Sequence, residues 1–89
     1  MTATLRFWAA AREAAGAAEE TVRSATLAEA LDEALRVRGG AEGGGAELSR
    51  VLARSSVLVD GVQVGRTDPS AVQLPDGAVV EILPPFAGG

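Results

Sequence analysis

Alternating apolar and polar residues near the start of the chain predict a β-strand. Within residues 4–9, Leu5 and Phe7 fall on one face of the strand, and Arg6 and Trp8 fall on the other. A period of two residues is typical of a strand that buries one face and exposes the other. We therefore expect Leu5 and Phe7 in the core and an outward register for Trp8.

Capping residues mark the boundaries of two helices. Residues 10–15 favour a short helix that Gly16 would end, before a second strand around residues 20–23. Thr26 and Glu29 have the spacing of a capping box, in which each side chain accepts a hydrogen bond from the other's amide. The main helix should begin there. Its apolar stripe, up to about Arg38, comprises Leu27, Ala30, Leu31, Ala34 and Leu35.

A glycine-rich segment follows the main helix. Residues 39–46 contain five glycines and no large side chain, a composition typical of a flexible surface loop. A phosphate-binding loop would need a lysine and a serine or threonine at the start of a helix, and none follows. We therefore interpret the segment as a loop. Leu48, Val51 and Leu52 predict a short second helix directly after it.

The second half of the chain has the pattern of a β-hairpin and a final strand. Asp60 and Gly61 interrupt an apolar run over residues 57–64, which is the best short-range hairpin signal in the sequence. A turn at residues 74–77 precedes an apolar strand over residues 78–83. The order strand, strand, helix, loop, hairpin, strand predicts an α+β fold, an antiparallel or mixed sheet with one main helix across a face.

Composition excludes several classes of function. The chain of 89 residues has no cysteine and no histidine, so it offers no thiolate nucleophile and no imidazole for acid–base chemistry or for a metal site. Its 12 carboxylates are spread along the sequence and are most simply interpreted as solvated surface. We therefore expect no metal, no bound cofactor and no catalysis by the chain alone.

Charge and hydropathy restrict the partners and the compartment. The net charge is −4 and all 8 basic residues are arginine, which disfavours nucleic acid and favours a basic protein partner. Because the chain has no lysine, one copy cannot be conjugated to a lysine of another. No apolar run reaches the length of a membrane span, and the start lacks the profile of a signal peptide. We expect a cytoplasmic protein without membrane contact.

The end of the chain predicts an extended tail. Pro84 and Pro85 cannot continue a strand ladder, so the folded domain should span residues 1–83 and the tail residues 84–89. Six extended residues reach roughly 20 Å at most, enough to enter another protein's active site. Two terminal glycines give a narrow end with free φ, although glycine is also common at frayed termini.

Both ends of the chain resemble one known family. Residues 7–16 (FWAAAREAAG) are similar to its N-terminal signature, and residues 81–89 (EILPPFAGG) are similar to its C-terminal one. The family is MoaD, the small subunit of molybdopterin synthase, within the wider group of ubiquitin-like sulfur carriers that includes ThiS. The resemblance implies a β-grasp fold, a mixed sheet with one main helix packed on it, in which the first and last strands are adjacent and parallel at the centre.

The resemblance also implies a mechanism and a set of partners. In such carriers an E1-like adenylating enzyme of the MoeB type uses ATP to adenylate the terminal carboxylate, here that of Gly89. A sulfur donor enzyme then converts the acyl-adenylate to a thiocarboxylate. A larger synthase subunit of the MoaE type takes the tail, and sulfur passes to cyclic pyranopterin monophosphate to build the dithiolene of molybdopterin.

The implied sites lie in the tail and beside it. Gly88 and Gly89 would carry the chemistry, with Gly88 required because a side chain there would collide with a narrow channel. For Trp8 the alternative is an ordinary place in the core under a loop or helix. The residues expected to bind partners are Trp8, Pro84, Pro85, Phe86 and Ala87.

Three other functions share this tail. A related carrier would serve cysteine, thiamin or another thio-product with the same chemistry at Gly89. Carriers similar to ThiS generally lack a segment like residues 7–16, which weighs against thiamin. A ubiquitin-like modifier would instead be joined to other proteins through an isopeptide bond. The remaining alternative is a plain interaction domain with an incidental Gly-Gly end.

Overall fold

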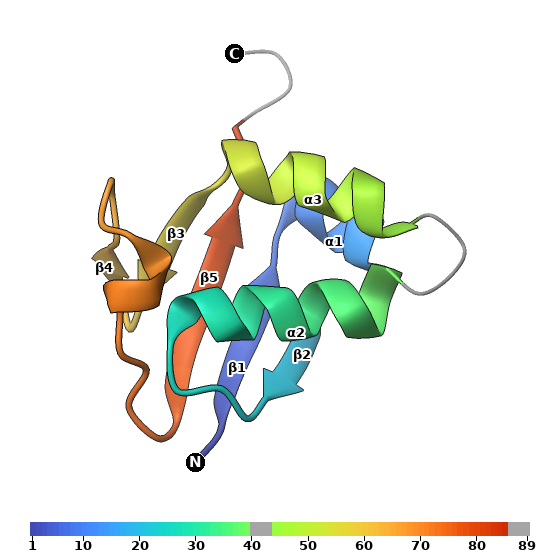
Figure 1. Cartoon of the computed structure of the whole chain (residues 1–89). Coiled ribbons are helices and arrows are strands. Elements are labelled where there is room, and N and C mark those ends of the chain that lie inside the picture. Colours follow the sequence, from blue (N-terminus) through green and yellow to red (C-terminus); the bar gives the residue numbers. More distant parts are fainter. Residues whose placement is uncertain (40–43, 86–89) are drawn as a thin grey trace.

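Strands and helices alternate along the chain in the computed structural model, which describes residues 1–39 and 44–85 (Figure 1). The elements in chain order are β1 (Ala3–Phe7), α1 (Ala9–Ala15), β2 (Glu19–Val22), α2 (Leu27–Gly39), α3 (Gly44–Arg54), β3 (Ser56–Val59), β4 (Val62–Gln63), the short 3-10 helix η1 (Pro69–Ala71) and β5 (Ala78–Leu83). The strands, the main helix and the hairpin occur in the predicted order.

The five strands form one mixed sheet in the order β2-β1-β5-β3-β4. β1 and β5 pair in parallel, with Leu5 opposite Val80, whereas the other pairings within the described sheet are antiparallel. The first and last strands are therefore neighbours, and β5 lies at the centre (Figure 1). The predicted α+β fold with a mixed sheet is confirmed.

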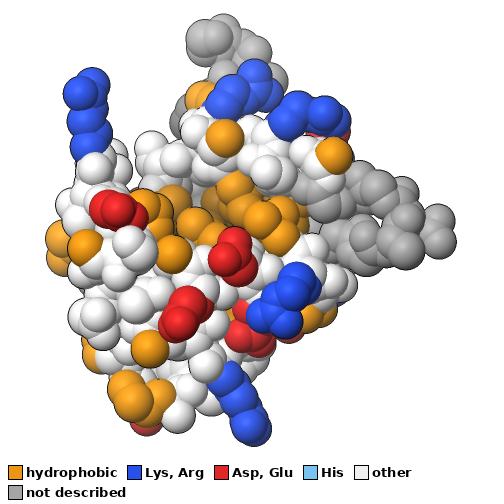
Figure 2. Space-filling view, in the orientation of Figure 1, with side chains coloured by type: hydrophobic (Ala, Val, Ile, Leu, Met, Phe, Trp, Pro, Cys, Tyr) orange, Lys and Arg blue, Asp and Glu red, His pale blue; other side chains and the backbone are white. Residues whose placement is uncertain are grey.

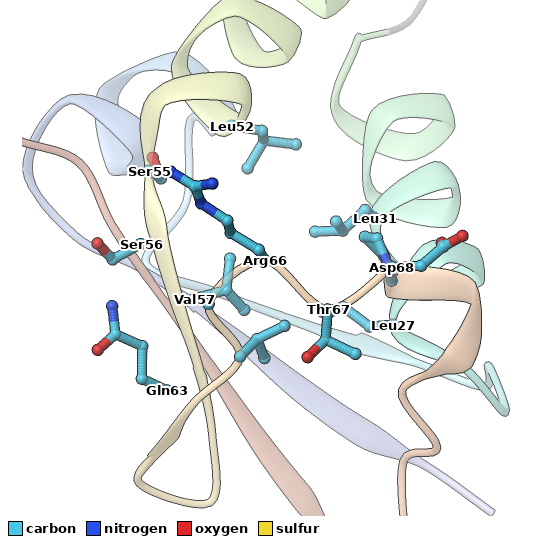
Figure 3. Close-up of a pocket in the computed structure, with 13 residues that line it drawn as sticks. Leu27, Leu31, Leu52, Ser55, Ser56, Val57, Gln63, Arg66, Thr67 and Asp68 are labelled. Carbon is cyan, nitrogen blue, oxygen red and sulfur yellow. The ribbon is translucent and has the colours of Figure 1, made fainter.

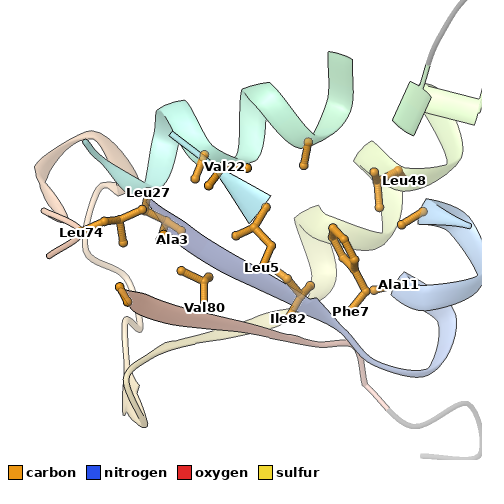
Figure 4. Close-up of a cluster of buried hydrophobic side chains, with 14 of the residues drawn as sticks. Ala3, Leu5, Phe7, Ala11, Val22, Leu27, Leu48, Leu74, Val80 and Ile82 are labelled. Carbon is orange, nitrogen blue, oxygen red and sulfur yellow. The ribbon is translucent and has the colours of Figure 1, made fainter. Parts of the chain in front are cut away.

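The hydrophobic core lies between one face of this sheet and the helices (Figure 4). Strand residues at alternate positions of β1 and β5 point into it, as the period of two predicts. The largest fully buried side chains are those of Leu5, Val22, Leu27, Leu48, Val80 and Ile82. The opposite face of the sheet, called the outer face below, carries no helix among residues 1–39 and 44–85.

β1 is shorter than the strand predicted at residues 4–9. It ends at Phe7, and the backbone of Ala9 adopts a left-handed conformation with φ of 48° where α1 begins. This conformation is uncommon for a residue with a Cβ atom, and it turns the chain out of the sheet. Gly16, with φ of 77°, ends α1 as predicted.

The capping box at the start of α2 is present as predicted. The Thr26 hydroxyl oxygen accepts a hydrogen bond from the Glu29 amide at 3.3 Å, and the Glu29 carboxylate accepts one from the Thr26 amide at 3.2 Å. Near the other end of α2, Arg38 pairs with Glu20 on the edge strand β2. Both ends of the main helix are therefore fixed to neighbouring parts of the chain.

The loop predicted at residues 39–46 is wrong at both ends. α2 includes Gly39 and α3 begins at Gly44, while residues 40–43 lie outside the described residues. α3 places Leu48 and Val51 in the core and contacts both α1 and α2. Burial of this apolar face offsets the poor helix propensity of glycine. The short helix predicted after the loop is therefore 11 residues long and packs beside the main helix.

The hairpin and the final strand agree with the sequence. Asp60 and Gly61 have φ of 50° and 84°, as a two-residue hairpin turn of type I′ requires. The Asp60 carboxylate accepts a hydrogen bond from the Val79 amide at 2.9 Å, and the Asp60 amide donates to the Val79 carbonyl at 2.8 Å. The aspartate therefore acts as a turn former and ties the hairpin to β5.

Candidate functional site

The carboxyl ends of the two central strands lie at the same edge of the sheet, because β1 and β5 are parallel. The Trp8 amide, just beyond β1, donates a hydrogen bond to the Ile82 carbonyl at 3.2 Å. β5 ends at Leu83, and Pro84 and Pro85 follow outside any helix or strand (Figure 1). Trp8 is thus close to the point where the chain leaves the sheet.

Trp8 combines a fixed backbone with a side chain at the surface. Its carbonyl accepts hydrogen bonds from the amides of Ala11 and Arg12 at 2.9 and 3.4 Å, in addition to the bond that its own amide makes. The exposed fraction of Trp8 is 42%. The outward register expected for Trp8 is therefore observed, and its role in binding a partner stays a prediction.

Two charged residues lie beside Trp8: Arg6, which contacts its ring, and Glu19, which contacts Arg6. The guanidinium carbon of Arg6 lies over the Trp8 ring, 5.3 Å from its centroid. Arg6 Nε is also 3.4 Å from Glu19 Oε2, and the two residues are opposite each other in the β1–β2 ladder. We call Arg6, Trp8 and Glu19 the Trp8 cluster. With Phe7, Arg12 and Ala18, the cluster borders a small hollow of about 110 Å³.

Apolar side chains of β3 and β5 also lie on the outer face. Val57 and Val59 pack against the core, so Leu58 between them points to the outer face. Leu83 follows the buried Ile82 and points the same way. Both leucines are half-buried. The site residues predicted from the sequence do not include Leu58, Leu83, Arg6 or Glu19. Alternation within each strand would have indicated the first three, whereas Glu19 is indicated only by the pairing of β1 with β2.

Four of the predicted site residues, Phe86, Ala87, Gly88 and Gly89, lie outside the described residues. Pro84 is half-buried and Pro85 is exposed. The division into a domain over residues 1–83 and a tail therefore stays a prediction, supported by the end of β5 at Leu83.

Two of the hollows on the helix side of the molecule border both α2 and α3. One, of about 350 Å³, is bordered by α2, α3, the hairpin and the segment before η1, with Leu31 and Leu52 at its apolar side and Arg66 and Asp68 among its polar residues (Figure 3). The other, of about 410 Å³, lies between α2 and α3, where Figure 2 shows apolar side chains gathered. Neither hollow is bordered by a predicted site residue.

One carboxylate in the described part of the chain, that of Asp68, has a clearly shifted pKa. Hydrogen bonds from the Ser70 amide and hydroxyl, at 2.9 and 2.8 Å, hold the pKa of Asp68 below its ordinary value. Asp68 caps η1, so this shift has a structural cause.

Residues 1–39 and 44–85 bring together no group of His, Cys, Asp and Glu side chains suited to a metal ion. Within the same ranges, no helix combines the length and apolar character that crossing a membrane requires.

Comparison with known proteins places these features in a family. A sequence model of the ThiS family matches residues 5–89, which include both terminal glycines. No curated protein sequence matches the chain.

Solved structures similar to this chain span nearly its whole length. The Haloferax volcanii HVO 2177 protein is 32% identical with a TM-score of 0.70, over 100% of this chain and 87% of that one. Small archaeal modifier protein 1 from Methanosarcina acetivorans is 20% identical with a TM-score of 0.77, over 99% and 96%. A chain in the complex of subunits 1 and 2 of the molybdopterin-converting factor from Helicobacter pylori 26695 is 24% identical with a TM-score of 0.65, over 100% of both. At these low identities the last two structures show similarity of fold alone, and that fold is the ubiquitin-like β-grasp.

Proposed function

This chain belongs to the ThiS family, and from that membership we propose that it is a sulfur carrier that works through the carboxylate of Gly89. The observation that carries the proposal is the family match over residues 5–89, because it includes Gly88 and Gly89. The fold is that of ubiquitin-like sulfur carriers of the ThiS and MoaD type. Because the chain has no cysteine, a sulfur atom that it carries must be bound to the terminus.

The proposed chemistry takes place at the terminal carbonyl carbon. An E1-like enzyme of the MoeB type binds ATP, and a carboxylate oxygen of Gly89 attacks the α-phosphorus so that pyrophosphate leaves. A sulfur nucleophile at the oxidation level of hydrosulfide, supplied by a donor enzyme, then attacks the carbonyl carbon. The bond to AMP breaks, and the terminus becomes a thiocarboxylate. Gly88 and Gly89 suit this chemistry because neither has a Cβ atom that would obstruct a narrow channel.

The proposed acceptor is the precursor of molybdopterin, cyclic pyranopterin monophosphate, held by a larger subunit of the MoaE type. The resemblance of residues 7–16 and 81–89 to the MoaD signatures supports this choice. The likeness in fold to a chain from a complex of subunits 1 and 2 of the molybdopterin-converting factor is consistent with it. Carriers that serve cysteine or thiamin would use the same terminal chemistry, so the acceptor has to be identified by experiment.

The partners are proposed to bind the chain at the end of the sheet where the carboxyl ends of β1 and β5 lie. Trp8 is exposed there, and Leu83, Pro84 and Pro85 begin the path toward the tail. Aromatic and apolar side chains of this kind are enriched at the centres of protein interfaces. A protein that takes the tail into its active site must approach this end of the sheet, so the same contacts would serve both the activating enzyme and the larger subunit. Phe86 and Ala87 would extend them along the tail.

A second candidate function is that of a ubiquitin-like modifier. It is favoured by the likeness in fold to small archaeal modifier protein 1, with a TM-score of 0.77 at 20% identity. A modifier would need the same adenylation of Gly89, but the carbonyl carbon would then be attacked by a lysine amine of another protein. This chain would not be such a target through a side chain, because it contains no lysine.

Intact-mass measurement on the protein isolated from its own cells tests the proposal. A thiocarboxylate makes the chain heavier by the difference between a sulfur and an oxygen atom, and alkylation of the terminus would confirm the thioacid. Removal of Gly89 should abolish this form while circular dichroism and thermal unfolding stay unchanged. Recovery of the chain joined to other proteins would favour the modifier. A loaded terminus in the truncated protein would refute the role of Gly89.

Partner binding is tested separately with Trp8→Ala. If Trp8 lies at the centre of the interface, its truncation should weaken the binding of the activating enzyme and of the larger subunit by about 30-fold or more. Val62→Ala is the matched control, because Val62 is an apolar residue that is 70% exposed on the edge strand β4. Equal binding by the two variants would remove Trp8 from the interface without affecting the chemistry proposed for Gly89.

A further inference from the structure

We infer that Arg6, held by Glu19, positions the Trp8 indole beside the start of the tail, so that a partner meets a surface that is already formed. The inference rests on the proposed function, because it concerns how the chain presents Trp8 to the proteins that process its terminus. Arg6 and Glu19 act in it as positioning residues, and neither needs to touch the reacting atoms.

Hydrogen bonds of both its amide and its carbonyl fix the backbone of Trp8. Its amide donates a hydrogen bond to the Ile82 carbonyl of β5, and its carbonyl accepts hydrogen bonds from the amides of Ala11 and Arg12 in the first turn of α1. The left-handed backbone of Ala9 directly after it fixes the direction in which the chain leaves the sheet. The freedom that remains to Trp8 is therefore rotation about its two side-chain torsions.

Arg6 restricts that rotation from the same face of β1. Residues 6 and 8 are two positions apart, so their side chains leave the strand on one side. The guanidinium carbon lies 5.3 Å from the centre of the Trp8 ring, within the range of a cation–π contact. A planar guanidinium can lie against an aromatic ring as a lysine ammonium cannot.

Glu19 in turn restricts Arg6. The two residues are directly opposite in the antiparallel β1–β2 ladder, and Arg6 Nε lies 3.4 Å from Glu19 Oε2. On its other side Arg6 is opposite Glu81 of β5 in the parallel ladder. Arg6 is therefore flanked by a carboxylate residue on each neighbouring strand, and its long side chain extends along β1 toward Trp8.

These contacts should matter more for binding than for folding. The side chains of Arg6 and Glu19 are 43% and 56% exposed, and ion pairs at such exposure contribute little to the stability of a fold. An interface gains affinity when its side chains are ordered before the partner arrives. Loss of the order imposed on one side chain should weaken binding by about 2- to 10-fold.

Fluorescence of the free chain measures the positioning directly. Trp8 is the one tryptophan of a chain without tyrosine, so the emission reports this side chain alone. Arg6→Gln should increase quenching by acrylamide and lower the fluorescence anisotropy, and Glu19→Gln should have the same effect to a smaller degree. Arg6→Lys retains the charge without the planar group and should restore the wild-type signal only in part. Arg50→Gln is the control, because it removes an arginine from an exposed ion pair on α3.

Binding is measured with the activating enzyme that loads the wild-type chain, by pyrophosphate exchange at increasing concentrations of the chain. Arg6→Gln should raise the concentration that gives half of the maximal rate by about 2- to 10-fold and leave the maximal rate unchanged. The same substitution in a Trp8→Ala chain should have no further effect, because Arg6 would act through the ring that is missing.

The outcomes separate the inference from the function on which it rests. Unchanged fluorescence in Arg6→Gln would overturn the inference, and so would changed fluorescence with unaltered exchange kinetics. A loss that persists in the Trp8→Ala chain would mean that Arg6 contacts the partner itself, which also overturns it. Failure of the wild-type chain to be loaded at all would instead refute the proposed function.

Discussion

Leu48→Ala tests whether α3 closes the core, as the structure has it. Leu48 is fully buried on the face of α3 that packs toward the sheet. Removal of three carbon atoms costs about 2.4 kcal/mol at the value for buried methylene groups. The cavity left behind raises the expected loss to about 3 kcal/mol in the free energy of unfolding.

A loss of this size is large for so short a chain. A domain of 89 residues has a total stability of about 4–13 kcal/mol. The midpoint of thermal unfolding should fall by more than about 10 °C. Urea unfolding followed by circular dichroism measures the free energy, and a calorimetric scan measures the midpoint.

Two variants on the same helix make the measurement specific. Ser49→Ala changes an exposed neighbour and should alter the free energy of unfolding by no more than about 0.5 kcal/mol. Leu52→Ala changes a half-buried residue and should fall between the two. If Leu48→Ala costs less than about 1 kcal/mol, α3 does not depend on burial of its apolar face. The explanation given for a helix that begins within a run of glycines would then be refuted.

Three further predictions concern the tail, a titratable group and a helix cap. Gly88→Ala should bind the activating enzyme almost normally but slow adenylation or sulfur transfer severely. Pyrophosphate exchange measures the first step and single-turnover transfer the second. Wild-type rates in both steps would show that no narrow channel is involved. Asp68→Ala should lower the free energy of unfolding at neutral pH. Because the folded-state pKa of Asp68 is lowered, this difference should disappear as the pH falls through that pKa; a difference that persists in acid would contradict its assignment to the carboxylate. Thr26→Ala should cost about 1 kcal/mol through loss of its bond to the Glu29 amide, and an unchanged urea midpoint would count against the cap.

Local signals in the sequence predicted most of the fold. The alternation at Leu5 and Phe7, the capping box at Thr26 and the turn at Asp60 each depend on neighbours within a few residues, and each is present in the structure. The parallel pairing of β1 with β5 joins residues more than 70 positions apart, such as Ala3 and Ala78. No local pattern indicates such a pairing, and the resemblance to a known family supplied it.

The errors occurred where tertiary packing decides the structure. Glycine has a low helix propensity, so Gly44 and its neighbours predicted a loop. Their place in α3 depends on burial of Leu48 and Val51 against elements distant in the sequence. The contacts within the Trp8 cluster were missed for a related reason: Arg6 and Glu19 are opposite each other only once β1 and β2 are paired in register.

The chemistry at Gly89 and the choice of a partner place different demands on the chain. In a sulfur carrier for molybdopterin, a carrier for another thio-product and a protein modifier, an activating enzyme would adenylate the same carboxylate, so the tail alone cannot distinguish among their partners. Discrimination needs side chains that a partner meets when it takes the tail, and these must be held in a constant position relative to it. The pairing of β1 with β5 holds Trp8 in such a position. The hydrogen bond from the Trp8 amide to the Ile82 carbonyl joins the Trp8 backbone to the strand from which the tail continues. Substitutions in the Trp8 cluster should therefore weaken the binding of the proteins that process the terminus, whereas substitutions at Gly88 should slow the chemical step in each of them.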